Sequence, residues 1–201
     1  MKEAFVKLVH TIHARGWSPG TGGNYSYVQS LEPFRLVVSP SGIDKGTLSP
    51  EKLLVVDEKG TVVEGNGKPS AETLLHVAIA QRWGGKVIVH THSIWNTIAS
   101  LRPGRAFEIE GLEMLKALEG NTTHEASELV PVVDNSQDME ALSGVLADTA
   151  EQFPRAHGVL LRGHGLYTWG DSIAQAQRHL EAFEFLFEVV VRNRAHGNGV
   201  D

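Results

Sequence analysis

The segment KVIVHTHS, residues 86–93, is the feature that most restricts the fold, because its apolar run ends in two histidines. The β-branched residues of this run favour an extended strand, and their hydrophobicity is typical of a buried one. Side chains alternate between the two faces of a strand, so His90 and His92 point the same way. The segment therefore predicts a buried strand that brings two imidazoles to one place.

Two imidazoles on one face of a strand can share a divalent cation, and neutral imidazole suits zinc and similar metals. The alternative is that one histidine packs in the core while the other ends the strand. A catalytic zinc site usually has a third protein ligand, and His164 in LLRGHGLY follows another apolar run. Its neighbours Gly163 and Gly165 permit close approach and unusual backbone angles. The chain has no cysteine, so any metal must be held by nitrogen and oxygen ligands.

The remaining histidines give weaker signals. His76 has helical spacing with Thr73 and Ala80, which favours a structural role inside a helix. For the other six, surface exposure or helix packing is the simplest expectation; they are His10, His13, His124, His157, His179 and His196.

Apolar periodicity and turn residues divide the chain into alternating helices and strands. Helical patterns cover residues 2–15, 94–101, 110–119, 138–152 and 172–195, and a further one runs from Ser70, its expected N-cap, to Trp83. Strand patterns cover 34–39, 52–57, 61–65, 84–93 and 129–134, with a strand pair at 157–170, and residues 16–26 read as a glycine-dense loop. This mixture predicts one α/β domain over residues 1–201, with a sheet between helical layers.

Charge and hydropathy exclude several classes of partner. The net charge is -6 without a basic run, which argues against nucleic acid as a partner. No apolar run approaches the roughly 20 residues of a membrane-spanning helix. The start, MKEAFVKLVHTIHARGW, reads as an amphipathic helix and not as a signal peptide. We expect a cytoplasmic protein with a small-molecule partner.

Three loops have the composition of anion sites. PGTGGNYS (19–26), SPSGID (39–44) and KPSAE (68–72) are rich in glycine, serine and asparagine, and such loops present backbone N–H groups and hydroxyls to anions. Ser70 would also stand at a helix N-terminus, where the dipole favours phosphate. Each loop alone could be a simple turn. Together with the histidine pair, they indicate a phosphorylated substrate that chelates a metal.

The motifs GTGGNYS, SPSGID, KPSAE, VIVHTHS and LLRGHGLYTWG fall in the order seen in the class II aldolase/adducin-like family. The chain resembles that family over residues 5–190. The resemblance implies an α/β fold with a central, mainly antiparallel sheet flanked by helices. It also implies one zinc ion per subunit on His90, His92 and His164, and a homotetramer with sites near subunit boundaries.

The resemblance extends to further site residues. Aldolases of the family use a glutamate that matches Glu72 as acid/base, whereas the dehydratases use one that matches Glu113. Ala71 stands where aldolases commonly have a second serine, which puts one phosphate contact in question. Either glutamate could instead be structural, Glu72 in a first helical turn and Glu113 as a solvated residue. The expected phosphate positions are Gly23, Asn24, Ser41, Gly42 and Ser70.

Within the family the likeness is greatest to the dehydratases of methionine salvage. RGWSPGTGGNYS, RPGRAFEIEGLEMLKAL and HGLYTWG carry it. It implies a hydro-lyase that converts 5-methylthioribulose 1-phosphate into 2,3-diketo-5-methylthiopentyl 1-phosphate. Two alternatives stay open: an aldolase or 4-epimerase of sugar phosphates, and a non-catalytic adducin-like binding module, which would not need the three histidines and the acids together.

Overall fold

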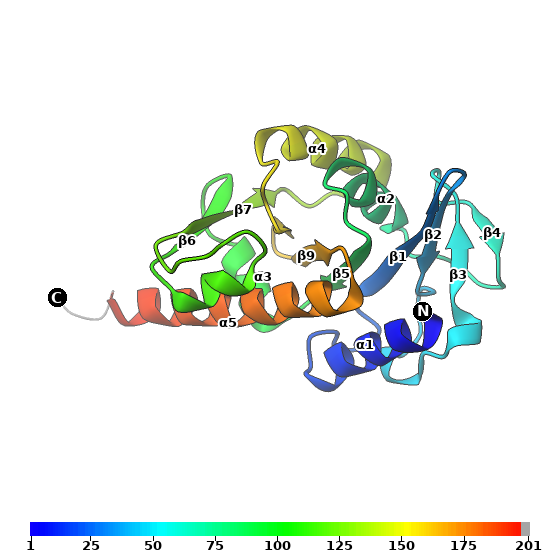
Figure 1. Ribbon diagram of the computed structural model, residues 1–201, viewed down its shortest axis with the longest axis horizontal. Helices are drawn as coiled ribbons and strands as arrows, with labels where there is room; N and C mark the ends of the chain where they lie inside the picture. Colours follow the sequence, from blue (N-terminus) through cyan, green and yellow to red (C-terminus); the bar gives the residue numbers. More distant parts are fainter. Residues whose placement is uncertain (198–201) are drawn as a thin grey trace.

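A computed structural model describes the backbone of residues 1–197 and the side chains of residues 1–194; His196 therefore lies outside the described side chains. Nine strands form one sheet in the order β4-β3-β2-β1-β5-β9-β8-β7-β6 (Figure 1). They are β1 (Asn24–Leu31), β2 (Phe34–Val38), β3 (Leu54–Val56), β4 (Val62–Glu64), β5 (Val87–Thr91), β6 (Ala106–Glu110), β7 (Ser127–Val133), β8 (Gly158–Leu161) and β9 (Gly165–Gly170). Only β7 and β8 pair in parallel among the described strands, so the expected mainly antiparallel sheet is confirmed.

Helices cover both faces of the sheet (Figure 1). They are α1 (Lys2–Ala14), α2 (Thr73–Arg82), α3 (Ile94–Ser100), α4 (Met139–Gln152) and α5 (Ile173–Gly197), with short 3-10 helices η1 (Lys45–Thr47), η2 (Pro50–Lys52) and η3 (Glu113–Ala117). The pair α2 and α4 lies on one face, and α1, α3 and α5 lie on the other. Within residues 1–197, no helix is both long enough and apolar enough to cross a membrane.

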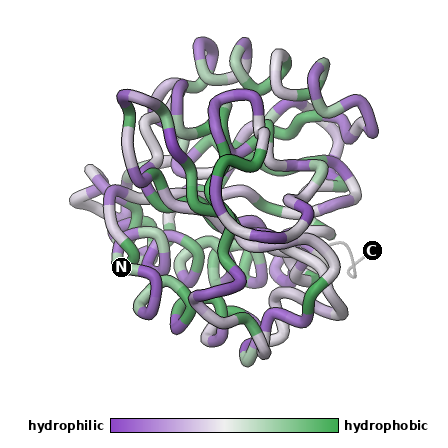
Figure 2. Tube along the Cα trace, turned by 90° about the vertical axis from the view of Figure 1, so that its right-hand side faces the viewer, coloured by the Kyte–Doolittle hydropathy of each residue, from purple (hydrophilic) through white to green (hydrophobic). Residues whose placement is uncertain are grey.

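Two packed layers of side chains form the core, one on each face of the sheet. Strand β9 shows how they are separated, because its neighbouring residues Leu166 and Tyr167 enter different clusters. Leu166 packs with residues such as Phe5 of α1 and Phe183 of α5, whereas Tyr167 packs with residues such as Leu75 of α2. Figure 2 shows hydrophobic segments running through the middle of the trace and hydrophilic ones in the outer turns.

Two predictions near the loops were wrong. The loop expected over residues 16–26 ends earlier, because β1 begins at Asn24 and pairs with both β2 and β5. Polar Asn24 and Ser26 obscured this strand, although they are buried like the intervening Tyr25. Helix α2 begins at Thr73 with Glu72 in the N-cap position, so Ser70 is not the N-cap. The Ser70 hydroxyl instead accepts a hydrogen bond from the Glu72 backbone N–H at 3.2 Å.

The prediction of a helix over residues 110–119 was also wrong. Residue Glu110 ends β6, and only the short 3-10 helix η3 follows. Gly111, with φ of 70°, separates the two elements in a conformation that favours glycine. Leu115 and Leu118 are both buried, and their spacing of three residues imitates the period of an α-helix.

Candidate metal centre and active site

The candidate site begins at the end of β5, whose five residues are all buried between β1 and β9. In the antiparallel register, His90 is opposite Asn24 of β1 and Tyr167 of β9. Residues directly opposite each other share a face of the sheet, so these three side chains form one row on the face that carries α2. The ring of Tyr167 stacks on that of His90, with centroids 3.9 Å apart.

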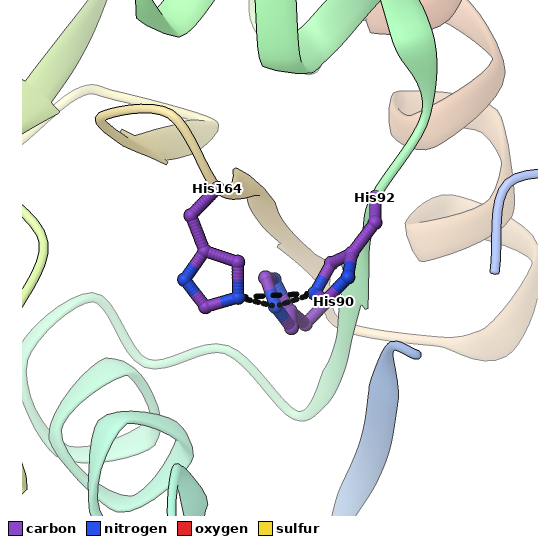
Figure 3. Close-up of side chains that lie close together, drawn as sticks. All are labelled: His90, His92 and His164. Carbon is purple, nitrogen blue, oxygen red and sulfur yellow. Dashed lines mark hydrogen bonds between the residues drawn. The ribbon is translucent and has the colours of Figure 1, made fainter. Parts of the chain in front are cut away.

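Three histidine side chains converge at the end of this row (Figure 3). The Nε2 atom of His90 lies 2.7 Å from Nε2 of His92 and 3.3 Å from Nε2 of His164. The third side of the triangle, between His92 and His164, measures 3.1 Å. His164 comes from the turn between β8 and β9, so segments far apart in the sequence build the cluster. The structure thus brings together the three histidines that the motif spacing predicted.

The protonation of His90 and His92 suits a metal. The backbone carbonyl of Leu166 accepts a hydrogen bond from Nδ1 of His90 at 3.0 Å, which leaves the lone pair on Nε2 facing the cluster. Burial, followed by the neighbouring histidines, holds the pKa of His90 well below its usual 6.5. Burial and His164 lower the pKa of His92 to about 4. Neutral imidazoles are the form that binds metals, so a nitrogen-only set of this kind fits zinc.

The two glycines beside His164 let the turn between β8 and β9 pack closely against the end of β5. A Cβ atom on Gly165 would lie 2.2 Å from the carbonyl oxygen of Thr91 and 3.1 Å from the ring of His92. Gly163 has φ of 66°, a conformation that other residues rarely adopt. Both glycines that flank His164 therefore serve the purpose expected from the sequence.

Glu72 lies beside the histidine cluster, with its side chain 13% exposed. Its Oε1 is 3.2 Å from Nε2 of His164, and its Oε2 is 3.5 Å from Nε2 of His90. The amide of Asn24 donates to Oε2 at 2.5 Å. A carboxylate in this position could complete the ligand set of a metal or exchange protons with a molecule bound there.

A small cavity of about 160 Å³ adjoins Glu72 and His92. All five positions expected to surround a phosphate line it: Gly23, Asn24, Ser41, Gly42 and Ser70. The three loops that the sequence singled out thus meet at one place, next to the histidines.

Lys45 also lines this cavity and was missed in the sequence. The side chain is only 1% exposed, and its Nζ donates to the carbonyl oxygens of Thr21 at 2.8 Å and Ile43 at 3.1 Å. Burial lowers the pKa of Lys45, and the charge of Asp44 opposes this effect. The signal was within reach, because Lys45 directly follows the SPSGID motif.

Glu113, the other expected acid, lies away from the histidine cluster and the small cavity. Its side chain is 72% exposed and pairs with Lys116 at 2.6 Å and His124 at 3.9 Å. The hydrogen bond from Lys116 lowers its pKa. Within the described side chains, Glu113 neither lines the small cavity nor contacts the three histidines.

Two groups of other histidines have more specific surroundings than packing alone. His76 is buried in α2, as expected, and also hydrogen-bonds to Ser26 and Asn24. His157 and His179 line a separate cavity of about 950 Å³, with ring centroids 5.2 Å apart. His157 is paired there with buried Glu128 at 3.0 Å.

The chain is similar to a known protein family over most of its length. The family described as Class II Aldolase and Adducin N-terminal domain matches residues 3–191. A methylthioribulose-1-phosphate dehydratase of Marinobacter nauticus is 42% identical over 189 residues, which cover 92% of this chain and 90% of that protein. The enzyme of the same name from Pseudomonas fluorescens is 42% identical over 198 residues, covering 97% of this chain and 94% of that protein.

Solved structures share the fold. YgbL from Escherichia coli, a putative aldolase/epimerase/decarboxylase, superposes with a TM-score of 0.78 at 25% identity, covering 94% of this chain and 87% of that one. An L-fuculose 1-phosphate aldolase gives a TM-score of 0.80 at 24% identity, covering 99% and 88% respectively. From the motif order, the fold and the extent of these matches, the chain belongs to the class II aldolase and adducin family.

Proposed function

We propose that this protein is a metal-dependent hydro-lyase that converts 5-methylthioribulose 1-phosphate into 2,3-diketo-5-methylthiopentyl 1-phosphate. The main support is that three convergent histidine nitrogens adjoin a small cavity with a buried lysine and a carboxylate. Relatives that match nearly the whole chain carry the name methylthioribulose-1-phosphate dehydratase. The reaction belongs to methionine salvage, and we place it in the cytoplasm.

The histidines would hold one zinc ion per subunit, through the Nε2 atoms of His90, His92 and His164. A bound zinc supplies Lewis-acid stabilisation of the negative charge that develops on the C2 and C3 oxygens of the substrate. The hydrogen bond from His90 to the Leu166 carbonyl keeps the first ring in the tautomer and orientation that this role needs.

The small cavity would hold the phosphate group. Lys45 supports this role, because within the described residues its ammonium group donates to two backbone carbonyls and forms no ion pair with a carboxylate. A buried cation of this kind is stabilised by an anion, and Gly23, Asn24 and Ser70 line the same space. Binding energy from the phosphate would then hold carbons 2–4 of the sugar beside the histidines.

The chain's acids would move the protons. A carboxylate takes the proton from C3, and the electron pair of that C–H bond forms an enediolate across C2 and C3. The electrons then expel the C4 hydroxyl, which leaves as water after it accepts a proton from a general acid. Protonation of C4, with loss of the proton from the C3 hydroxyl, converts the resulting enol into the second ketone. The net change is the loss of one water molecule.

We assign these proton transfers to Glu113, with Glu72 in an assisting position. Because Glu113 is exposed in one chain and does not line the small cavity, this role requires that a neighbouring copy present it. The assignment therefore goes with the proposed homotetramer, in which sites lie near subunit boundaries. It predicts that Glu113→Gln abolishes turnover without loss of bound metal.

One observation favours a second candidate, an aldolase or 4-epimerase of sugar phosphates. Glu72, the position used as acid/base by aldolases, is within 3.5 Å of two histidine nitrogens in a single chain. If Glu72 performs the proton transfers without Glu113, the same metal and phosphate sites would suit cleavage or epimerisation.

Zinc-loaded protein should be incubated separately with 5-methylthioribulose 1-phosphate, L-fuculose 1-phosphate and L-ribulose 5-phosphate, with products identified by mass spectrometry. We expect loss of water from the first substrate only. Glu113→Gln should abolish that reaction, while the exposed neighbour Glu110→Gln serves as a matched control and keeps it. Cleavage or epimerisation of a second substrate would support the alternative instead. Stoichiometric zinc binding with no turnover of any of the three would overturn the proposed reaction.

A further inference from the structure

A chain of hydrogen bonds leads from the interior of the sheet to the candidate site. The Ser26 hydroxyl and Nδ1 of His76 are 2.7 Å apart, and Nε2 of His76 bonds the Oδ1 atom of Asn24. The amide nitrogen of Asn24 then reaches Oε2 of Glu72 at 2.5 Å and the hydroxyl of Ser70 at 3.3 Å. Ser26, His76 and Asn24 are all buried, so no bulk solvent competes for these bonds.

The direction of every bond follows from its end at Glu72. The amide nitrogen of Asn24, which can only donate, faces both the carboxylate oxygen of Glu72 and the hydroxyl of Ser70. The carbonyl oxygen of Asn24 then faces His76, and an amide oxygen only accepts. Nε2 of His76 must therefore carry the hydrogen.

The remaining link has a defined direction for the same reason. Burial lowers the pKa of His76 to about 3, so the ring is neutral and carries a single N–H. With that hydrogen on Nε2, Nδ1 is an acceptor, and the hydroxyl of Ser26 must donate to it. All the donors thus point from Ser26 towards Glu72.

We propose that His76 and Ser26 are positioning residues that fix the orientation of the Asn24 amide. An asparagine side chain rotated by half a turn occupies nearly the same volume with its oxygen and nitrogen exchanged. In this site, the rotated form would place the carbonyl oxygen of Asn24 against the Glu72 carboxylate and withdraw a donor from Ser70. The His76 N–H disfavours this rotated form, because it would then face an NH₂ group.

This orientation matters for both halves of the candidate site. Asn24 and Ser70 line the cavity proposed for phosphate, and Glu72 adjoins the histidines. The inference rests on the proposed function only in assigning those roles; the hydrogen-bond direction itself does not depend on them. Partners that orient site residues in this way typically change activity by about 10–100-fold when they are removed.

The first test measures the tautomer directly, without substrate. Nitrogen-15 NMR of histidine-labelled, zinc-loaded protein should show His76 neutral, with its hydrogen on Nε2, from pH 6 to pH 8. The signal is identified by its loss in His76→Gln. A hydrogen on Nδ1, or a doubly protonated ring at pH 6, would overturn the proposed direction whatever the enzyme's substrate is.

The second test compares His76→Gln with His76→Leu. The glutamine amide can place an N–H near the former Nε2, whereas leucine has no donor. For 5-methylthioribulose 1-phosphate, we expect His76→Leu to lower kcat/KM at least tenfold, and His76→Gln to recover most of this loss. Ser26→Ala should give a smaller loss, since the remaining bonds persist.

Measurements of stability and of metal content distinguish a positioning role of His76 and Ser26 from a purely structural one. Thermal unfolding and bound zinc are measured for each variant, and kinetics are compared on folded, zinc-loaded protein. If activity followed stability alone, or if the glutamine and leucine variants were equally impaired, the positioning role would be wrong. If the wild type did not turn over this substrate, the NMR result would still decide the hydrogen-bond direction.

Discussion

Glu184 offers a test of how burial controls the stability of this fold. The residue lies on α5, is 4% exposed, and accepts a hydrogen bond from the Asn96 amide at 3.0 Å. Asn96 also donates to the Thr91 hydroxyl at 3.0 Å, so Glu184 is connected to the end of β5, between His90 and His92. Burial raises the pKa of Glu184 to about 7, and hydrogen bonding from Ser93 and Asn96 offsets this only in part.

The raised pKa has a definite sign for stability. The folded state holds the Glu184 proton more tightly than the unfolded state, where the pKa is near 4.5. Stability is therefore lost as the pH rises from about 4.5 through about 7, and the loss is complete above that range. A difference of about 2.5 pH units, at roughly 1.4 kcal/mol each, corresponds to about 3 kcal/mol.

Glu184→Gln should remove this loss, because glutamine keeps the shape and the acceptor without ionising. Urea denaturation of both proteins at pH 5 and pH 8 measures the effect. We expect the variant to gain about 2–3 kcal/mol relative to the wild type between pH 5 and pH 8. Glu188→Gln, one turn further on the same helix and more exposed, is the comparison variant: the charge of Glu188 adds only a smaller contribution to the raised pKa of Glu184, so this variant should change the difference by less than about 1 kcal/mol. A Glu184→Gln effect that was equal at both pH values would refute the reasoning.

Three further outcomes follow from the structure. Gly165→Ala should destabilise the protein by about 3 kcal/mol in thermal unfolding, because its Cβ would lie 2.2 Å from a carbonyl oxygen; Gly144→Ala, with open space around it, should stabilise α4 by about 0.5–1 kcal/mol. Equal effects of the two would contradict this. Burial alone would lower the pKa of His157, but hydrogen bonding and charge from Glu128 raise it, so the pair's contribution fades as the pH rises through that pKa. Glu128→Gln should accordingly destabilise more at pH 6 than at pH 9 in urea denaturation. Removal of zinc by a chelator should lower the melting temperature of the wild type and leave that of metal-free His92→Ala unchanged.

Elements with a strong apolar period could be predicted from the sequence. The run ending in His90 forms the central strand, and helix α1 buries Phe5, Leu8 and Ile12 as its spacing indicates. Strand β1 could not be recognised in the same way, because it begins with buried Asn24 and buried Ser26 interrupts its apolar pattern. The side chain of Asn24 is hydrogen-bonded to residues about 50 positions away in the sequence, and local periodicity does not report such contacts.

The part of the candidate site that lies within short sequence motifs could be predicted from residue spacing. The i, i+2 spacing of His90 and His92 predicted that their side chains meet, and the glycines that flank His164 indicated it as the third member of the cluster. The role of Lys45 depends on how its loop packs against Thr21, which no short motif encodes. The proposed approach of Glu113 to the site of a neighbouring copy is likewise not contained in the spacing of residues along one chain.

In the proposed reaction, the three histidines hold the metal on which turnover depends. The most direct measurement titrates metal-free protein with zinc, and follows bound zinc and dehydration of 5-methylthioribulose 1-phosphate in the same samples. We expect turnover to rise in proportion to bound zinc and to stop rising at one equivalent per chain, and we expect His92→Ala to show neither zinc binding nor turnover. Turnover that was independent of bound zinc, or that survived in His92→Ala, would contradict this role of the histidines.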